Sequence, residues 1–182
     1  MSVDAAFSHS YREARDKFIE APRPGGLPVE SKRHPETGRE GEELAMDVAR
    51  EGDPNASKLL ILSSACHGVE GFCGSGVQVS ALRDAAWREH ARRNGVAVLY
   101  VHALNPFGFS HLRRVTQENV DLNRNFHDFA KPLPKNAAYR ELHDLLFPDT
   151  WPPSKENDDA LAAWIEKDGR PAYQAAISSG QH

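Results

Sequence analysis

The residues best suited to chemistry are His67 and Glu70, an imidazole and a carboxylate three positions apart. They follow the apolar run Leu59–Leu62, which is too short for a helix and is interpreted as a buried strand. Open α/β sheets bind their ligands beyond the carboxyl ends of the strands, where this pair would lie. Imidazole and carboxylate groups are ordinary zinc ligands, so the pair predicts two of the three protein ligands of a catalytic zinc.

A second polar segment lies downstream and has neither helical nor strand periodicity. It runs from the turn Asn105–Gly108 through Arg113 and Arg114 to Asp121–Phe126. A guanidinium offers paired donors to a carboxylate and stays charged at any ordinary pH. Two arginine positions together with Asn123 could therefore form a clamp for a carboxylate.

Taken in order, these motifs resemble the zinc carboxypeptidase superfamily, which also includes succinylglutamate desuccinylase and aspartoacylase. The matching motifs are His-Gly-Val-Glu, Asn-Pro-x-Gly, an arginine and Asp-x-Asn-Arg-Asn-Phe, and they cover roughly residues 55 to 130. The likeness is greatest to an uncharacterised bacterial branch of the superfamily. It implies an α/β fold with a mixed, mostly parallel sheet and helices on both faces.

The resemblance also implies roles for individual residues. His67 and Glu70 would bind zinc, while Asn123 and Arg124 would bind the terminal carboxylate of the substrate. Arg114, or otherwise the adjacent Arg113, matches the arginine that polarises the scissile carbonyl and holds the oxyanion; in the first assignment Arg113 contacts the substrate. The implied reaction is zinc-dependent hydrolysis of an amide bond adjacent to a free carboxylate, in a peptide or an N-acyl amino acid.

The chain also departs from the family pattern, because the third zinc ligand and the general-base glutamate of the superfamily lie far downstream of the first pair. Six histidines follow Glu70, and none stands in a motif that matches the third-ligand segment: His90, His102, His111, His127, His143 and His182. We therefore expect residues 1–182 to form a single, incomplete catalytic domain, the amino-terminal half of a larger one. A catalytically incomplete fragment or a carboxylate-binding module without hydrolytic activity is the alternative.

Other chemistries receive less support from the residues. The glycines of Gly74–Gly76 lack the third glycine of a dinucleotide loop, where Val79 stands instead. No Gly-x-Ser-x-Gly elbow surrounds any serine near the strand end. Asp121 is interpreted as a structural acid that holds its loop by accepting hydrogen bonds. Cys66 and Cys73 are expected in the core. His102 and His127 are expected to be ordinary packed or surface histidines.

Composition narrows the range of partners and compartments. With 40% apolar and 26% charged residues the chain belongs among soluble globular proteins. A net charge of −4 gives no reason to expect a nucleic-acid partner. Two cysteines make no disulfide framework, and the sequence has neither a signal peptide nor a membrane span, so we expect a cytoplasmic protein without a membrane partner. The oligomeric state is not indicated.

Periodicity and turn residues predict the elements that position these motifs. Two apolar strands flank a helix, which is typical of a βαβ unit with parallel pairing. A polar stretch between two short strands predicts a β-hairpin. Asp158 or Asp159 is expected to N-cap a late helix, and Pro171 to lie in the first turn of the last one. The expected elements are a helix over 4–20, strands over 27–32, 43–49, 59–62 and 96–104, and helices over 76–94, 137–147, 158–167 and from 171 to before 180.

Overall fold

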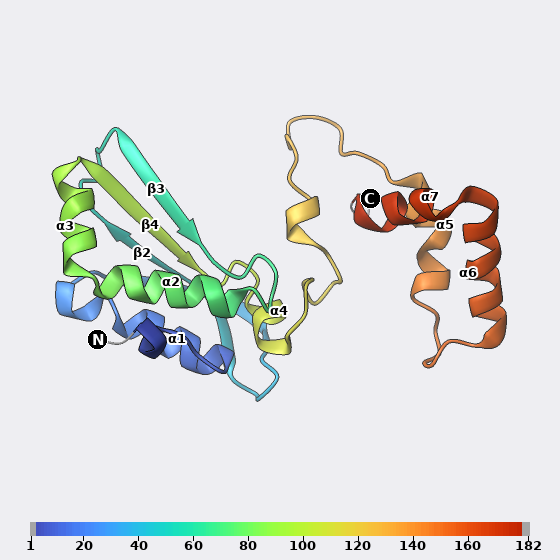
Figure 1. Cartoon of the computed structure of the whole chain (residues 1–182), viewed down its shortest axis with the longest axis horizontal. Coiled ribbons are helices and arrows are strands. Elements are labelled where there is room, and N and C mark those ends of the chain that lie inside the picture. The colour runs from blue at the N-terminus through green and yellow to red at the C-terminus, as the bar shows by residue number, and fades with distance from the viewer. Residues whose placement is uncertain (1–2, 180–182) are drawn as a thin grey trace. The chain divides into compact units, whose positions relative to one another are not determined.

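The computed structural model describes residues 3–179, and its contacts divide the chain into two compact units, Met1–Asn119 and Val120–His182. The first unit contains a four-stranded sheet with helices, and the second is helical (Figure 1). His67, Glu70, Arg113 and Arg114 belong to the first unit. Asn123 and Arg124 belong to the second.

The sheet of the first unit has the strand order β1-β2-β4-β3. β1 pairs with β2 and β2 with β4 in antiparallel fashion, whereas β3 and β4 are parallel. The predicted hairpin and the predicted parallel pair are confirmed. The expectation of a mostly parallel sheet is wrong, because the hairpin strand β2 pairs directly with β4 and makes the sheet mostly antiparallel. The bounds are β1 (Val29–Thr37), β2 (Glu43–Glu51), β3 (Lys58–Ser63) and β4 (Val96–His102).

Side-chain caps mark the start of the helices α1 (Tyr11–Glu20) and α3 (Ala85–Arg93) in the first unit. Ser10 Oγ accepts a hydrogen bond from the Glu13 N–H at the start of α1. Asp84 leaves the helical conformation, and its carboxylate accepts from the N–H groups of Ala86 and Trp87. The single helix expected over 76–94 is therefore two. The helical elements are η1 (Val3–Ala6), α1 (Tyr11–Glu20), η2 (Arg23–Gly25), α2 (Gly71–Arg83), α3 (Ala85–Arg93) and α4 (Pro106–His111).

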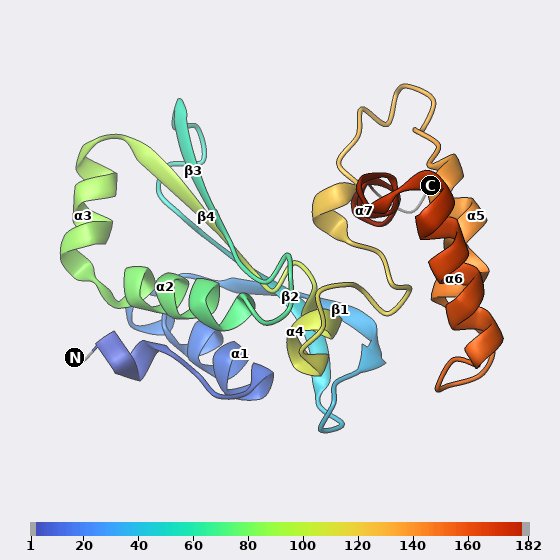
Figure 2. The same ribbon diagram turned by 45° about the vertical axis from the view of Figure 1, so that its right-hand side comes forward.

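The main core lies between the sheet and the helices α1 and α2, which run along one face of the sheet (Figure 2). Phe18 of α1, Val79 of α2 and Val98 of β4 are fully buried there. Trp87 of α3 packs against Tyr100 on the same face of the sheet. The prediction of helices on both faces is therefore wrong for α1, α2 and α3.

The strand that precedes His67 is less buried than its composition indicates. β3 is at the edge of the sheet, and Leu59 and Ile61 are 53% and 57% exposed. Leu59 and Ile61 pair in register with Ala97 and Leu99 of β4. Because side chains alternate along a strand, Ala97 and Leu99 lie on the face opposite to the helix-facing side chains of β4. The side chains of Leu59 and Ile61 therefore point away from α1 and α2. The prediction of a buried strand is wrong because an apolar run does not distinguish a central strand from an edge strand.

A buried polar cluster lies beneath the helices of the first unit. The fully buried Asp47 of β2 accepts a hydrogen bond from Arg15 Nε at 2.9 Å. His102 of β4 pairs with the Ser75 hydroxyl through Nε2 at 3.0 Å, and its ring stacks on Phe18. His102 is therefore a packed histidine, as the sequence led us to expect.

We expect His102 to make the fold sensitive to acid. Burial, with a smaller effect of the nearby Arg15, lowers the pKa of His102 from 6.5 to about 3. As the pH falls, His102 therefore becomes protonated in the unfolded chain before it does so in the folded protein. The stability that depends on neutral His102 is fully present above pH 6.5 and is lost progressively as the pH falls toward 3. The loss between pH 7 and pH 4 should be about 3 kcal/mol.

Urea unfolding at a series of pH values tests this expectation. His102→Gln keeps a polar partner for Ser75 but has no group that titrates in this range. Its free energy of unfolding should fall less steeply with acid than that of the wild type. Parallel pH profiles for the two proteins would contradict the assigned role.

The second unit consists of η3 (Leu122–Arg124), α5 (Ala137–Leu146), α6 (Lys155–Asp168) and α7 (Arg170–Ser178). The N-cap of α6 is Ser154, not Asp158 or Asp159, because the helix begins earlier than its apolar pattern. Pro171 lies in the first turn of α7, as predicted. Among residues 3–179, no helix is both long and apolar enough to span a membrane.

Candidate functional site

His67 and Glu70 lie in the loop that joins β3 to α2, with Glu70 at the N-cap position of α2. The structure brings the two side chains together: His67 Nδ1 is 3.2 Å from Glu70 Oε1. The His67 side chain is mostly buried, at 13% exposure, whereas that of Glu70 is 65% exposed. The pair therefore presents one nitrogen and one carboxylate oxygen at the surface beyond the carboxyl end of β3.

The separation of the two atoms fits a shared zinc ion. Zinc binds imidazole nitrogen and carboxylate oxygen at about 2.0 to 2.2 Å in tetrahedral geometry, which places two such ligand atoms roughly 3.3 Å apart. The observed 3.2 Å is close to that spacing and is also the length of the hydrogen bond between the two side chains. The part of the chain that the structure describes contains no group of three or more His, Cys, Asp or Glu side chains that could hold a metal. His67 and Glu70 therefore have the donor types of two zinc ligands, with no such group of three around them among the described residues.

The loops after the parallel strands β3 and β4 are joined by backbone hydrogen bonds. The Leu104 N–H donates to Ser64 O at 3.0 Å, and the Asn105 N–H donates to Ala65 O at 2.9 Å. Ala65 and Ala103 are buried with φ of 54° and 58°, a left-handed conformation that costs an L-residue about 1 to 2 kcal/mol. Such strain is found at functional sites, where the surrounding structure enforces it.

The Asn-Pro-x-Gly motif forms the start of α4. Asn105 is the N-cap, and its Oδ1 accepts from the Gly108 N–H at 2.8 Å. Pro106 occupies the first turn, where the missing N–H costs nothing. Leu112 ends the helix with φ of 55°, which turns the chain into Arg113. The motif therefore directs the arginine segment back toward the β3 loop.

Gly68 is where the two motifs meet. Its N–H donates to Arg113 O at 3.0 Å. A Cβ atom at Gly68 would lie 2.0 Å from Gly108 O and 2.2 Å from Arg113 O, so only glycine allows the approach. The role of Gly68 in joining the motifs was not predicted, although its place between His67 and Glu70 and the second glycine at Gly108 were visible in the sequence.

The two arginines that follow α4 have exposed side chains. Arg113 is held at its backbone by Gly68 and by its own N–H, which donates to Gly108 O at 2.8 Å. Its Nη2 donates to Asn119 Oδ1 across 3.4 Å, a long hydrogen bond. The Arg113-Arg114 segment is thus fixed beside the His67 loop by its main chain.

In the second unit, Asn123 and Arg124 form the short helix η3 and are exposed. Asp121 caps this helix: its Oδ1 accepts from the Asn123 N–H at 2.9 Å. Its carbonyl oxygen accepts from Asn125 Nδ2 at 2.7 Å. The prediction that Asp121 holds its loop by accepting hydrogen bonds is confirmed.

The structure also bears on the other chemistries. Gly74–Gly76 lies inside α2 and forms no loop that could hold a dinucleotide. Neither cysteine forms a disulfide within the described residues; Cys66 is partly buried and Cys73 is exposed, so the prediction of a core position is wrong for Cys73. The ring of His127 contacts Phe129 edge-on. His182 lies outside the described residues.

Comparison with known proteins gives a distant structural match and a family. The chain is similar to a solved structure from work titled "Structural and kinetic characterization of Porphyromonas gingivalis glutaminyl cyclase", with 16% identity and a TM-score of 0.35. The match covers 59% of this chain and 47% of that one, so the chain spans about half its length. No curated protein matches. The family described as "Protein of unknown function (DUF2817)" matches residues 7–182, so the chain belongs to the DUF2817 family.

Proposed function

We propose that this chain carries part of the active site of a zinc-dependent hydrolase that cleaves an amide bond adjacent to a free carboxylate. The observation that carries the proposal is the convergence of His67 Nδ1 and Glu70 Oε1 to 3.2 Å beyond the carboxyl end of β3. The hydrogen bond from Gly68 to Arg113, which joins the two motifs, supports it further. The substrate would be a peptide C-terminus or an N-acyl amino acid.

In this proposal His67 and Glu70 are two of the three protein ligands of zinc. Zinc bound there would supply Lewis-acid chemistry and lower the pKa of a coordinated water to about 7. The residues of this chain would contribute by fixing the positions of the two ligands. The partly buried His67 ring is held near Glu70, and the strained turns at Ala65 and Ala103 fix the loop that bears them.

Arg114 is the residue we assign to the oxyanion. This assignment rests on the family resemblance, and Arg113, whose Nη2 donates to Asn119 Oδ1, is kept as a substrate contact. A guanidinium aimed at a developing negative charge stabilises the transition state more than the ground state. Asn123 and Arg124 are assigned to the substrate carboxylate on the family resemblance, because an amide and a guanidinium can both donate to it.

The proposal is tested by hydrolysis of N-acyl amino acids and of short peptides with a free carboxyl terminus, measured with zinc added. The matched control substrates are the same compounds with the carboxylate blocked as an amide. Measured on the natural full-length protein, zinc-dependent cleavage should be seen with the free acids only and should be lost in His67→Ala. Binding of the free acids that persists without zinc and without cleavage would favour the carboxylate-binding module instead.

Kinetics of two arginine variants separate their proposed roles. Arg114→Ala should lower kcat by about a hundred- to a thousand-fold, because it removes an interaction made in the transition state. Arg124→Ala should mainly raise KM, because it removes an interaction that the bound substrate already makes. Steady-state measurements on one N-acyl amino acid provide both constants. Equal and small effects of the two changes would contradict the assignment.

A further inference from the structure

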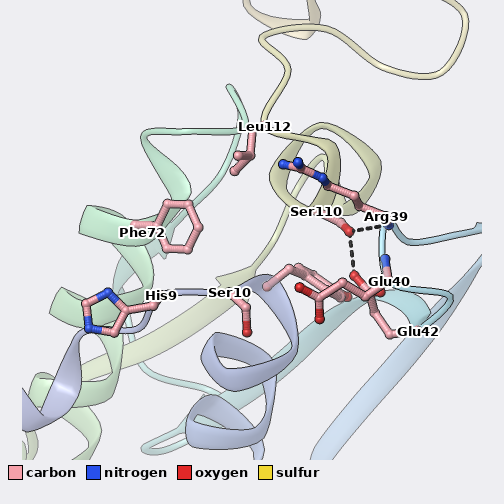
Figure 3. A pocket seen from close by; sticks show the side chains of 9 residues that line it. His9, Ser10, Arg39, Glu40, Glu42, Phe72, Ser110 and Leu112 are labelled. Atoms are coloured by element: carbon pink, nitrogen blue, oxygen red, sulfur yellow. Dashed lines mark hydrogen bonds between the residues drawn. The ribbon is translucent and has the colours of Figure 1, made fainter.

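A small pocket lies beside the start of α1 in the first unit, and its lining includes neither His67 nor Glu70. Its volume is about 290 Å³, near the lower end of the range for small-molecule sites, about 300 to 1,000 Å³. Figure 3 shows charged side chains on the β1–β2 hairpin side and His9 and Phe72 on the opposite side. The lining includes Arg39, Glu40, Glu42, Phe72 and Leu112.

Glu42 places a desolvated negative charge at the pocket. The residue is only 6% exposed, and its carboxylate accepts hydrogen bonds from the Ser110 hydroxyl and from the Glu40 N–H. Burial opposes ionisation of Glu42, but its hydrogen bonds, together with the positive charge of the nearby Arg12, outweigh it and lower its pKa. The carboxylate is therefore charged at neutral pH, in a setting where its attraction for a cation is screened less than in water.

Arg39 and Glu40 add one charge of each sign to the pocket wall. Their backbone N–H groups are bound to Ser110 Oγ at 2.8 Å and to Glu42 Oε2 at 2.9 Å. Within residues 3–179, neither the Arg39 guanidinium nor the Glu40 carboxylate makes an ion pair or a hydrogen bond with another side chain. Both side chains are exposed, so their charges are available to a ligand.

We infer that this pocket binds a small zwitterion, an α-amino acid with an apolar side chain. Its ammonium group would be held by Glu40 and Glu42, and its carboxylate by Arg39. The wall formed by Phe72 and Leu112 suits an aliphatic side chain. A simple amine would leave Arg39 unpaired, and a simple acid would be repelled by two carboxylates. The inference is independent of the proposed hydrolase.

Isothermal titration calorimetry with three matched probes tests the inference, with EDTA present so that bound metal plays no part. The probes are L-leucine, 3-methylbutylamine, which lacks the carboxylate, and 4-methylpentanoate, which lacks the ammonium group. Leucine should bind at least about tenfold more tightly than either partial analogue. Equal binding of leucine and one of the analogues, or no binding of leucine at any soluble concentration, would overturn the inference.

Variants locate the binding and are chosen at exposed positions so that folding is preserved. Glu40→Gln and Arg39→Gln should each weaken leucine binding about tenfold. Glu36→Gln changes an exposed carboxylate of β1 outside the pocket lining and should leave leucine binding unchanged, as should His67→Ala. Full leucine affinity in both pocket variants, or its loss in His67→Ala, would place the binding elsewhere and overturn the inference.

Discussion

Gly68→Ala should destabilise the first unit by about 3 kcal/mol or more and should also abolish the zinc binding that we propose for His67 and Glu70. The new methyl carbon would lie 2.0 Å from Gly108 O and 2.2 Å from Arg113 O, and neither backbone oxygen can move as a flexible side chain would. The hydrogen bond from Gly68 to Arg113 must break as the two loops separate. His67 and Glu70 flank the displaced residue, so their shared geometry should be lost with it.

The matched control is Gly41→Ala in the β1–β2 turn. Gly41 has φ of 77°, and no atom lies within 4 Å of the position that a Cβ would take, so the cost of this change is conformational only, about 1 to 2 kcal/mol. Urea unfolding measures the free energy of unfolding of both variants, and zinc titration shows whether each variant binds zinc. If Gly68→Ala is as stable as Gly41→Ala and still binds zinc, the close approach of the two loops is not required.

Arg15→Leu is the second change with a large expected effect. Asp47 is fully buried, and Arg15 is the cation that pairs with it, through Nε at 2.9 Å. Removing one partner of a buried pair leaves an uncompensated charge, which typically costs about 3 to 5 kcal/mol. Replacing both residues with leucine should recover most of that loss, because no charge is then left buried.

An exposed ion pair on the same sheet provides the comparison. Arg33 pairs with Glu43 at 2.6 Å, with side chains 74% and 41% exposed. Arg33→Leu should therefore cost less than about 1 kcal/mol, because exposed pairs are screened by solvent. Urea unfolding of Arg15→Leu, Arg33→Leu and the variant with both Arg15 and Asp47 replaced measures all three effects. Similar losses for the two single variants would show that the burial of Asp47 is not what makes Arg15 necessary.

Local sequence patterns predicted the parts of the fold that depend on neighbouring residues. The hairpin follows from turn residues between two short strands, and the parallel pair of β3 and β4 follows from a helix between two apolar runs. The proximity of His67 and Glu70 follows from their spacing of three in one loop. The hydrogen-bond acceptance of Asp121 was predicted from its motif, and its side chain accepts from the Asn123 N–H two positions later.

The features that the sequence did not predict depend on residues far apart in the chain. The pairing of β2 with β4 makes the sheet mostly antiparallel and leaves β3 at its edge, and no local pattern specifies it. The contact of Gly68 with Arg113 is equally non-local. The pocket beside α1 is lined by residues far apart in the chain: the Ser110 hydroxyl donates to the carboxylate of Glu42, which lies 68 positions earlier. The break at Asp84 was missed because apolar periodicity continues across it.

The most direct test of the central claim is the zinc content of the natural full-length protein after dialysis against zinc and then against zinc-free buffer, measured by mass spectrometry of the metal. We predict about one zinc per chain in the wild type and its loss in His67→Ala and in Glu70→Gln. His90→Ala, which changes an exposed histidine of α3, should retain the metal. A wild-type protein without zinc, or a zinc content unchanged in His67→Ala, would contradict the assignment of this pair as zinc ligands.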